Sequence, residues 1–147
     1  MVCTFFGHRD TPSDIAPRLR EILMELIVKR NICVFYVGFC GAFDRLVIRT
    51  LSELKTTFPH ISVTVVLAYL PSAPLALPES VETLFPAEAA TAPRRYAIDR
   101  VNRWLVNHAD LFVTYITRPQ GGAATYARLA ARRGKEIIEL GKQSENV

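Results

Sequence analysis

Glycine turns that follow predicted strands are the features of this sequence best suited to bind an anion. The glycines of this kind are Gly7, Gly38, Gly41, Gly121 and Gly122. Glycine tolerates positive φ angles and lets main-chain N–H groups come close to a ligand, and successive amides in such turns form concave sites for phosphate oxygens. Parallel strands end at one edge of a sheet, where open sheets bind their ligands. The sequence therefore predicts an anion site at that edge.

Charged and polar side chains accompany the same turns. GHRD (7–10) follows the first predicted strand, and GFCGAFDR (38–45) follows the second and brings a carboxylate into the first turn of a helix. Arg118 precedes the double glycine, which opens a helix whose N-terminal amides and dipole favour an anion. The side chains predicted to contact a ligand are His8, Arg9, Asp44, Arg95, Arg100, Asn102 and Thr125.

Two common phosphate-binding motifs and the usual metal-binding spacings are absent from the sequence. No GxxxxGK followed by Ser or Thr marks a P-loop, and no GxGxxG follows a predicted strand. The three cysteines, Cys3, Cys33 and Cys40, show no CxxC spacing, so neither a zinc site nor a disulfide framework is predicted. We expect no metal, no cofactor and reduced thiols in a cytoplasmic protein.

Alternating strand and helix patterns must position these turns. Short apolar runs predict strands at 3–6, 33–37, 61–70, 111–116 and 136–140. Apolar stripes at helical spacing predict helices at 14–29, 43–54, 95–108 and 123–133. This alternation is typical of βα units. It predicts a single Rossmann-like α/β domain with a mainly parallel five-stranded sheet and helices on both faces.

The segment 70–94 interrupts this alternation. It contains five of the nine prolines and is predicted to be a loop, longer than a routine connection between a strand and a helix. Long loops at the carboxyl edge of a sheet are often functional. We therefore expect this segment to close over a bound ligand.

Composition limits the class of protein. The chain has 147 residues, half of them apolar, with 22% charged residues and a net charge of +4. These values predict one domain over 1–147, with an ordered core at 2–140 and a short C-terminal tail. No apolar run reaches the ~20 residues of a membrane span, and Arg9 and Asp10 interrupt the apolar start, so no membrane segment or signal peptide is expected. Fourteen of the 18 basic residues are arginine, which suits phosphate.

Four motifs resemble those of the SLOG superfamily, the Rossmann-like fold shared by Smf/DprA proteins and LOG phosphoribohydrolases. The motifs are FFGHRDTP (5–12), YVGFCGAFDR (36–45), PRRYAIDRVNRW (93–104) and GGAATYARLAARRGKEIIEL (121–140). They stand in the family's order and are most similar to the YpsA-like branch. The resemblance implies a dimer or higher oligomer that binds nucleotides or NAD-derived molecules, with Gly121, Gly122 and Thr125 at the phosphate.

The sequence departs from the LOG enzymes where their catalytic glutamates belong. Ala124 stands in place of the third glycine of the LOG motif, and Ala127 and Arg128 stand in place of the glutamates. The prediction is therefore a non-catalytic sensor or sequestering module for a phosphate-bearing nucleotide or an ADP-ribose derivative.

Two alternative functions remain open at this point. The first is a nucleotide N-glycosidase in which Asp44 or Asp99 replaces the lost glutamates. The second is DprA-like binding of single-stranded nucleic acid, which depends on aromatic side chains interleaved with basic ones. Tyr96 and Trp104 are the only aromatic residues beside the arginines of the predicted helix at 95–108. Two aromatic residues give little stacking surface, so nucleic acid is not the expected partner.

Overall fold

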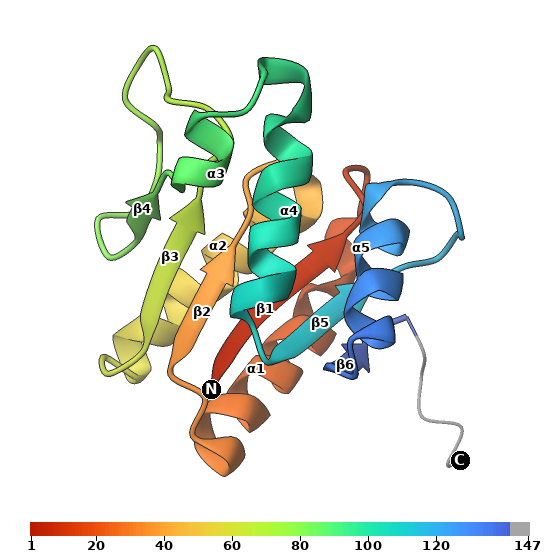
Figure 1. Cartoon of the computed structure of the whole chain (residues 1–147). Helices are drawn as coiled ribbons and strands as arrows, with labels where there is room; N and C mark the ends of the chain where they lie inside the picture. The colour runs from red at the N-terminus through yellow and green to blue at the C-terminus, as the bar shows by residue number, and fades with distance from the viewer. Residues whose placement is uncertain (142–147) are drawn as a thin grey trace.

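The computed structural model describes residues 1–141 as an α/β fold built on one parallel sheet (Figure 1). Within that range the strands are β1 (Val2–Gly7), β2 (Val34–Val37), β3 (Ser62–Val66), β4 (Glu82–Leu84), β5 (Leu111–Tyr115) and β6 (Glu136–Glu139). They pair in the order β4-β3-β2-β1-β5-β6, and every pairing is parallel. The predicted parallel α/β sheet is confirmed, with six strands where five were expected. The predicted C-terminal tail, apart from Gly141, lies outside the described residues.

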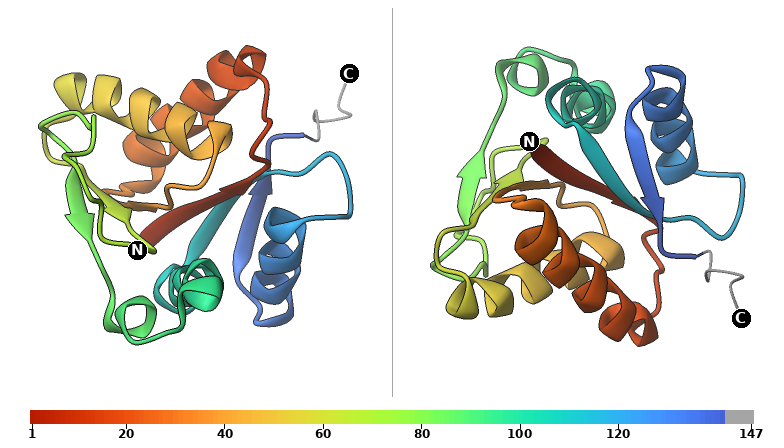
Figure 2. Two further views of the ribbon diagram at one scale, coloured as in Figure 1. Left: turned by 90° about the horizontal axis from the view of Figure 1, so that it is seen from above. Right: turned by 90° about the horizontal axis from the view of Figure 1, so that it is seen from below.

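Helices cover both faces of the sheet. The described helices are α1 (Ala16–Arg30), α2 (Ala42–Thr57), α3 (Ala87–Ala90), α4 (Ala97–His108) and α5 (Gly122–Arg132), with 3₁₀ turns η1 (Ser13–Ile15) and η2 (Arg94–Tyr96). α1 and α2 lie on one face, and α3, α4 and α5 lie on the other (Figure 2). No helix within residues 1–141 is long and apolar enough to cross a membrane.

The additional strand, β4, lies in the segment that the sequence predicts to be a loop. β4 pairs with β3 at the edge of the sheet, and all of its residues are exposed. A strand of three exposed residues is too short to show an alternation of apolar and polar side chains in the sequence. Only its pairing with β3 identifies it as a strand. The segment 70–94 is therefore partly ordered by the sheet, and the prediction of an uninterrupted loop is wrong.

Neighbouring phenylalanines of β1 anchor the two halves of the core. Because successive strand residues point to opposite faces, Phe5 packs toward α1 and α2, whereas Phe6 packs toward α4 and α5. The Phe5 ring lies 6.2 Å from that of Phe35, and the Phe6 ring lies 5.8 Å from that of Phe112. Burial of each such ring stabilises the fold by about 1.5–3 kcal/mol. β1 is thus fixed from both faces, and so is the turn that follows it.

The strand order places a topological switch point between β1 and β5. From β1 the chain continues to α1 on one face, whereas from β5 it continues to α5 on the opposite face (Figure 2). The two connections therefore diverge at the carboxyl ends of adjacent strands. Open α/β sheets form their ligand crevices at such points.

Candidate functional site

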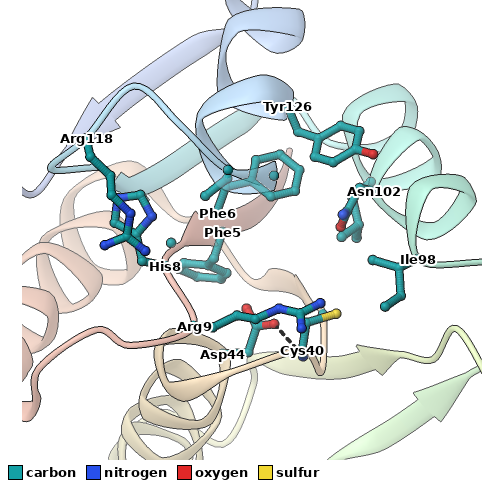
Figure 3. Close-up of a pocket in the computed structure, with 16 residues that line it drawn as sticks. Phe5, Phe6, His8, Arg9, Cys40, Asp44, Ile98, Asn102, Arg118 and Tyr126 are labelled. Atoms are coloured by element: carbon teal, nitrogen blue, oxygen red, sulfur yellow. Dashed lines mark hydrogen bonds between the residues drawn. The ribbon is translucent and has the colours of Figure 1, made fainter.

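A cavity of about 400 Å³ opens at this switch point (Figure 3). Its walls come from the turns after β1 and β2, the first turn of α2, the loop before α5, and the facing sides of α4 and α5. In Figure 3, Arg9, Asp44 and Cys40 lie on the α2 side, whereas Tyr126 and Asn102 lie on the side of α5 and α4. The cavity occupies the sheet edge at which the glycine turns predict a ligand.

Most of the residues predicted to contact a ligand line this cavity. They are Gly7, His8, Arg9, Gly38, Asp44, Asn102, Gly121 and Gly122. These residues come from segments more than 100 positions apart in the sequence, and the parallel pairing of β1 with β2 and β5 brings them to one edge. The fold therefore brings residues of all four motifs to one cavity, and the third motif contributes Ile98 and Asn102.

Four predicted contact residues lie outside the cavity lining. Gly41 packs against the main chain of Arg9 instead. Arg95 belongs to η2, and its guanidinium lies 4.8 Å from the centre of the Tyr96 ring. Arg100 lines a separate groove between α3 and α4. The hydroxyl of Thr125 donates to the Gly121 carbonyl oxygen at 3.1 Å, within the first turn of α5.

Packing within the protein accounts for three of the glycines. A Cβ atom at Gly7 would lie 2.2 Å from the Phe43 ring, and one at Gly41 would lie 2.6 Å from Arg9 Cα. At Gly38 it would lie 3.2 Å from a carboxylate oxygen of Asp44. The Ala42 amide also donates to the Arg9 carbonyl at 2.9 Å, which holds the turns after β1 and β2 together. These three glycines build the wall of the cavity.

The double glycine at the start of α5 is different, because side chains of residues 1–141 do not fill the space around it. Gly121 has φ +98° and ψ 170°, a conformation that side chains strongly disfavour. Apart from the adjoining main chain, no atom of residues 1–141 lies within 4 Å of the position of a Cβ at Gly121, and at Gly122 only Tyr126 does. This turn therefore exposes its main chain.

His8 joins two loops at the floor of the cavity. Its side chain is buried, and its Nε2 accepts a hydrogen bond from the Thr117 amide at 3.0 Å. A nitrogen that accepts in this way carries no proton, so the proton of the neutral ring is on Nδ1. Burial lowers the pKa of His8, and the charge of Arg118 lowers it further against the opposing effect of Asp10. His8 is thus a neutral imidazole at physiological pH.

Asp44 is a partly buried carboxylate in the first turn of α2. Its Oδ2 accepts a hydrogen bond from the Cys40 amide at 2.9 Å. Burial raises the pKa of Asp44 to about 6, although that hydrogen bond and the charges of Arg45 and Arg9 act in the opposite direction. Burial and the charge of Asp44 also raise the pKa of the Cys40 thiol. Cys40 is therefore a neutral lining group and not an activated nucleophile.

Two arginines provide positive charge at the cavity. The exposed Arg9 guanidinium makes no hydrogen bond or ion pair with another residue of the described part of the chain. Arg118 donates to both carboxylate oxygens of Asp10, at 3.0 and 3.3 Å, and this bond lowers the pKa of Asp10. Both ends of the Arg118–Asp10 pair are exposed, so the pair is weak and exchangeable.

Asp99 does not line the cavity, but it holds a residue that does. It accepts hydrogen bonds from the Tyr126 hydroxyl and from Nε of Arg103. Tyr126 was not among the predicted contacts. The sequence did carry a signal for Tyr126: it lies four residues after Gly122, and residues four apart lie on the same face of a helix. Ile98 and Asn102 show the same spacing on α4, where both line the cavity.

Two further arrangements bear on the predictions from sequence. None of the residues 70–94 lines the cavity, so closure of this segment over a ligand remains a prediction. No group of three or more His, Cys, Asp or Glu side chains among residues 1–141 could hold a metal ion.

The chain was also compared with known proteins. No protein-family model matches it, and a search of curated proteins finds no match. The resemblance to the SLOG superfamily therefore remains a prediction from the four sequence motifs.

Proposed function

We propose that this protein binds a phosphate-bearing nucleotide, or a ligand derived from NAD or ADP-ribose, in the cavity between β1 and β5. In this proposal it acts as a non-catalytic sensor or sequestering module. The observation that carries the proposal is the exposed Gly121–Gly122 turn, which shares one cavity with the guanidinium groups of Arg9 and Arg118.

The phosphate end of the ligand is assigned to that turn. The amides of Gly122, Ala123 and Ala124 are the first of α5 and have no partner within the helix. None of them donates a hydrogen bond to another residue among 1–141. Free amides at a helix N-terminus bind anions through direct hydrogen bonds and the helix dipole. Arg9 and Arg118 add charge-assisted hydrogen bonds of the kind that phosphate favours.

The base and sugar are assigned to the wall formed by Phe6 and by the facing sides of α4 and α5. Phe6, Ile98, Leu105 and Tyr126 give this wall apolar and aromatic surface, and Asn102 adds an amide that can both donate and accept hydrogen bonds. Nucleotide sites commonly combine such surface with a few polar groups that fix orientation. The cavity thus combines cationic and apolar surface, which complements a ligand that has an anionic phosphate and a base.

The state of the carboxylates supports binding without bond cleavage. Asp99 accepts hydrogen bonds from Tyr126 and Arg103 and does not line the cavity. At the positions of the LOG glutamates, Ala127 is buried and Arg128 donates to the Pro119 carbonyl oxygen. Neither position presents a carboxylate to the cavity.

Isothermal titration with ADP, ADP-ribose and NAD tests the proposal. We expect at least one of them to bind, with an affinity that falls as salt concentration rises. Arg9→Ala is expected to reduce that affinity about tenfold or more, because a charge-assisted hydrogen bond contributes about 1.5–3 kcal/mol. The matched control is Arg100→Ala, which removes an arginine from the separate groove and should leave the affinity unchanged. Absence of binding by all three ligands would reject the proposal.

A second candidate function is hydrolysis of a nucleotide N-glycosidic bond. The observation in its favour is that Asp44 lines the cavity with a pKa of about 6, in the range useful for a general acid or base. Incubation with nucleoside monophosphates and chromatography would detect free base. Base released by the wild type and absent for Asp44→Asn would support this candidate over a binding module.

The remaining parts of the proposal rest on the sequence motifs. Membership of the SLOG superfamily, its YpsA-like branch, a cytoplasmic location and assembly into a homodimer or higher oligomer all follow from the resemblance or the composition. Analytical ultracentrifugation with and without ADP-ribose tests the assembly. Binding of single-stranded nucleic acid stays the third possibility, and a salt-dependent anisotropy change with labelled oligonucleotides would support it.

A further inference from the structure

A chain of hydrogen bonds fixes the direction of the Tyr126 hydroxyl in the cavity wall. The hydroxyl lies between α5 and α4 and donates to Oδ1 of Asp99. Arg103, one turn along α4, donates through Nε to both oxygens of Asp99 at 3.1 and 3.2 Å. The carboxylate is therefore held from two sides, and it lies behind the residues that face the cavity.

The charge state of Asp99 makes the phenol the donor. Burial acts to raise the pKa of Asp99, but the hydrogen bonds from Tyr126 and Arg103 outweigh it and keep the pKa below the ordinary value. An ionised carboxylate can only accept hydrogen bonds. Burial and this bond to Asp99 raise the pKa of Tyr126 to about 12. The proton of the phenol is thus committed to Asp99, and its oxygen has only acceptor capacity left.

Asn102 lies beside Tyr126, and both line the cavity (Figure 3). Its side chain opposes the rise in the pKa of that phenol. The amide oxygen of Asn102 can accept a hydrogen bond from a ligand, and its amide nitrogen can donate one. In this corner of the cavity, the Tyr126 oxygen is therefore the group that can only accept.

We propose that Tyr126 and Asn102 are specificity-determining residues, which select a ligand that presents a hydrogen-bond donor to this corner. The inference rests on the proposed function, because it concerns the base and sugar end of the same nucleotide. Donors of this kind are the exocyclic amine of an aminated base and the hydroxyls of ribose. A phosphate oxygen cannot supply that donor, whereas the free amides of the Gly121–Gly122 turn can donate to it.

Paired ligands separate the two sources of the donor. The affinities of AMP and IMP, and those of CMP and UMP, compare a base that carries an exocyclic amine with one that carries a carbonyl instead. The affinities of AMP and 2′,3′-dideoxy-AMP compare a sugar with and without its hydroxyls. We expect AMP to bind about tenfold more tightly than at least one of its analogues, because an acceptor left without a donor loses a hydrogen bond and its solvation. Tyr126→Phe should reduce that preference to about twofold or less. Tyr96→Phe, which changes an exposed tyrosine outside the cavity, is the matched control.

A second readout needs no ligand. Asp99→Asn should let Tyr126 ionise nearer the ordinary tyrosine pKa of 10, observed by NMR of ¹³Cζ-labelled tyrosine between pH 9 and 11.5. In the wild type this signal should change only toward the upper end of that range, well short of the midpoint. The inference is overturned if Asp99→Asn leaves the Tyr126 signal unchanged, or if AMP binds and Tyr126→Phe retains the full preference. The second result would leave the proposed function intact, whereas failure of every nucleotide to bind the wild type would reject both.

Discussion

The Thr117 amide donates a hydrogen bond to Nε2 of His8 at 3.0 Å and so ties the loop after β5 to the turn after β1. These loops leave adjacent strands toward opposite faces of the sheet, and the candidate cavity opens between them. The hydroxyl and the amide of Thr11 both donate to the His8 carbonyl, which fixes the main chain at the same point. His8 thus links the two loops that border the cavity.

Stability is expected to depend on pH through His8. The folded state lowers the pKa of His8 below its ordinary value of 6.5. The unfolded chain therefore binds more protons than the folded chain just below pH 6.5, so stability falls as the pH drops through this range. Protonation of Nε2 would also remove the acceptor for the hydrogen bond from the Thr117 amide.

Chemical denaturation between pH 7.5 and 5 measures this effect. His8→Asn removes the titrating group and should show a flatter decline in unfolding free energy than the wild type. Parallel pH profiles for the two proteins would mean that His8 does not carry the dependence.

Asp44→Asn is expected to stabilise the protein at pH 7 by about 3 kcal/mol. The fold raises the pKa of Asp44 from 3.8 to about 6, so the folded state binds more protons than the unfolded state between these values. The stabilising contribution of protonated Asp44 to the free energy of unfolding is therefore lost as the pH rises from about 4 to 6. Asparagine retains an oxygen for the Cys40 amide.

Denaturation curves for wild type and Asp44→Asn at pH 4 and pH 7 check this sign. The difference between the two proteins should be present at pH 7 and should shrink at pH 4. A variant that is less stable than the wild type at pH 7 would contradict the assigned direction.

Gly7→Ala is expected to destabilise the protein, whereas Gly122→Ala is not. The added methyl group at Gly7 would overlap the Phe43 ring, and such overpacking costs about 1–3 kcal/mol or more. At Gly122 the nearest atom is Tyr126 Cε2 at 3.8 Å, an ordinary contact, so alanine should be neutral or slightly stabilising. Urea unfolding compares the two variants, and equal destabilisation by both would be inconsistent with the packing described.

Asp10→Asn is expected to raise the affinity for a phosphate-bearing ligand by about two- to fivefold. Asp10 engages both ends of the Arg118 fork, so removing its charge frees the guanidinium for the ligand. In the background of Arg118→Ala, the same substitution should have almost no effect. Titration of ADP into the four proteins gives the coupling directly. An equal gain in affinity with and without Arg118 would show that Asp10 acts through long-range repulsion of the ligand and not through Arg118.

Local patterns made most of the architecture predictable. Leu19, Leu23 and Leu26 fall on one helical stripe, and they are buried under the sheet as predicted. β4 was missed because three exposed residues carry no periodic signal. Arg95 and Arg100 lie outside the cavity lining, which the sequence pattern could not have shown. A helical wheel ranks positions around one axis, but it does not say which flank faces a neighbouring loop.

The sequence alone determined the alternation of strands and helices apart from β4 and α3, the parallel α/β class and the concentration of glycines at strand ends. Periodicity and turn chemistry are local properties of the chain. Only the tertiary structure decided that Gly7 and Gly41 serve packing while Gly121 and Gly122 remain open, and that Tyr126 joins Asn102 across two helices. These relationships depend on which segments meet in space. Strand pairing between β1 and β5, more than 100 residues apart, sets those distances.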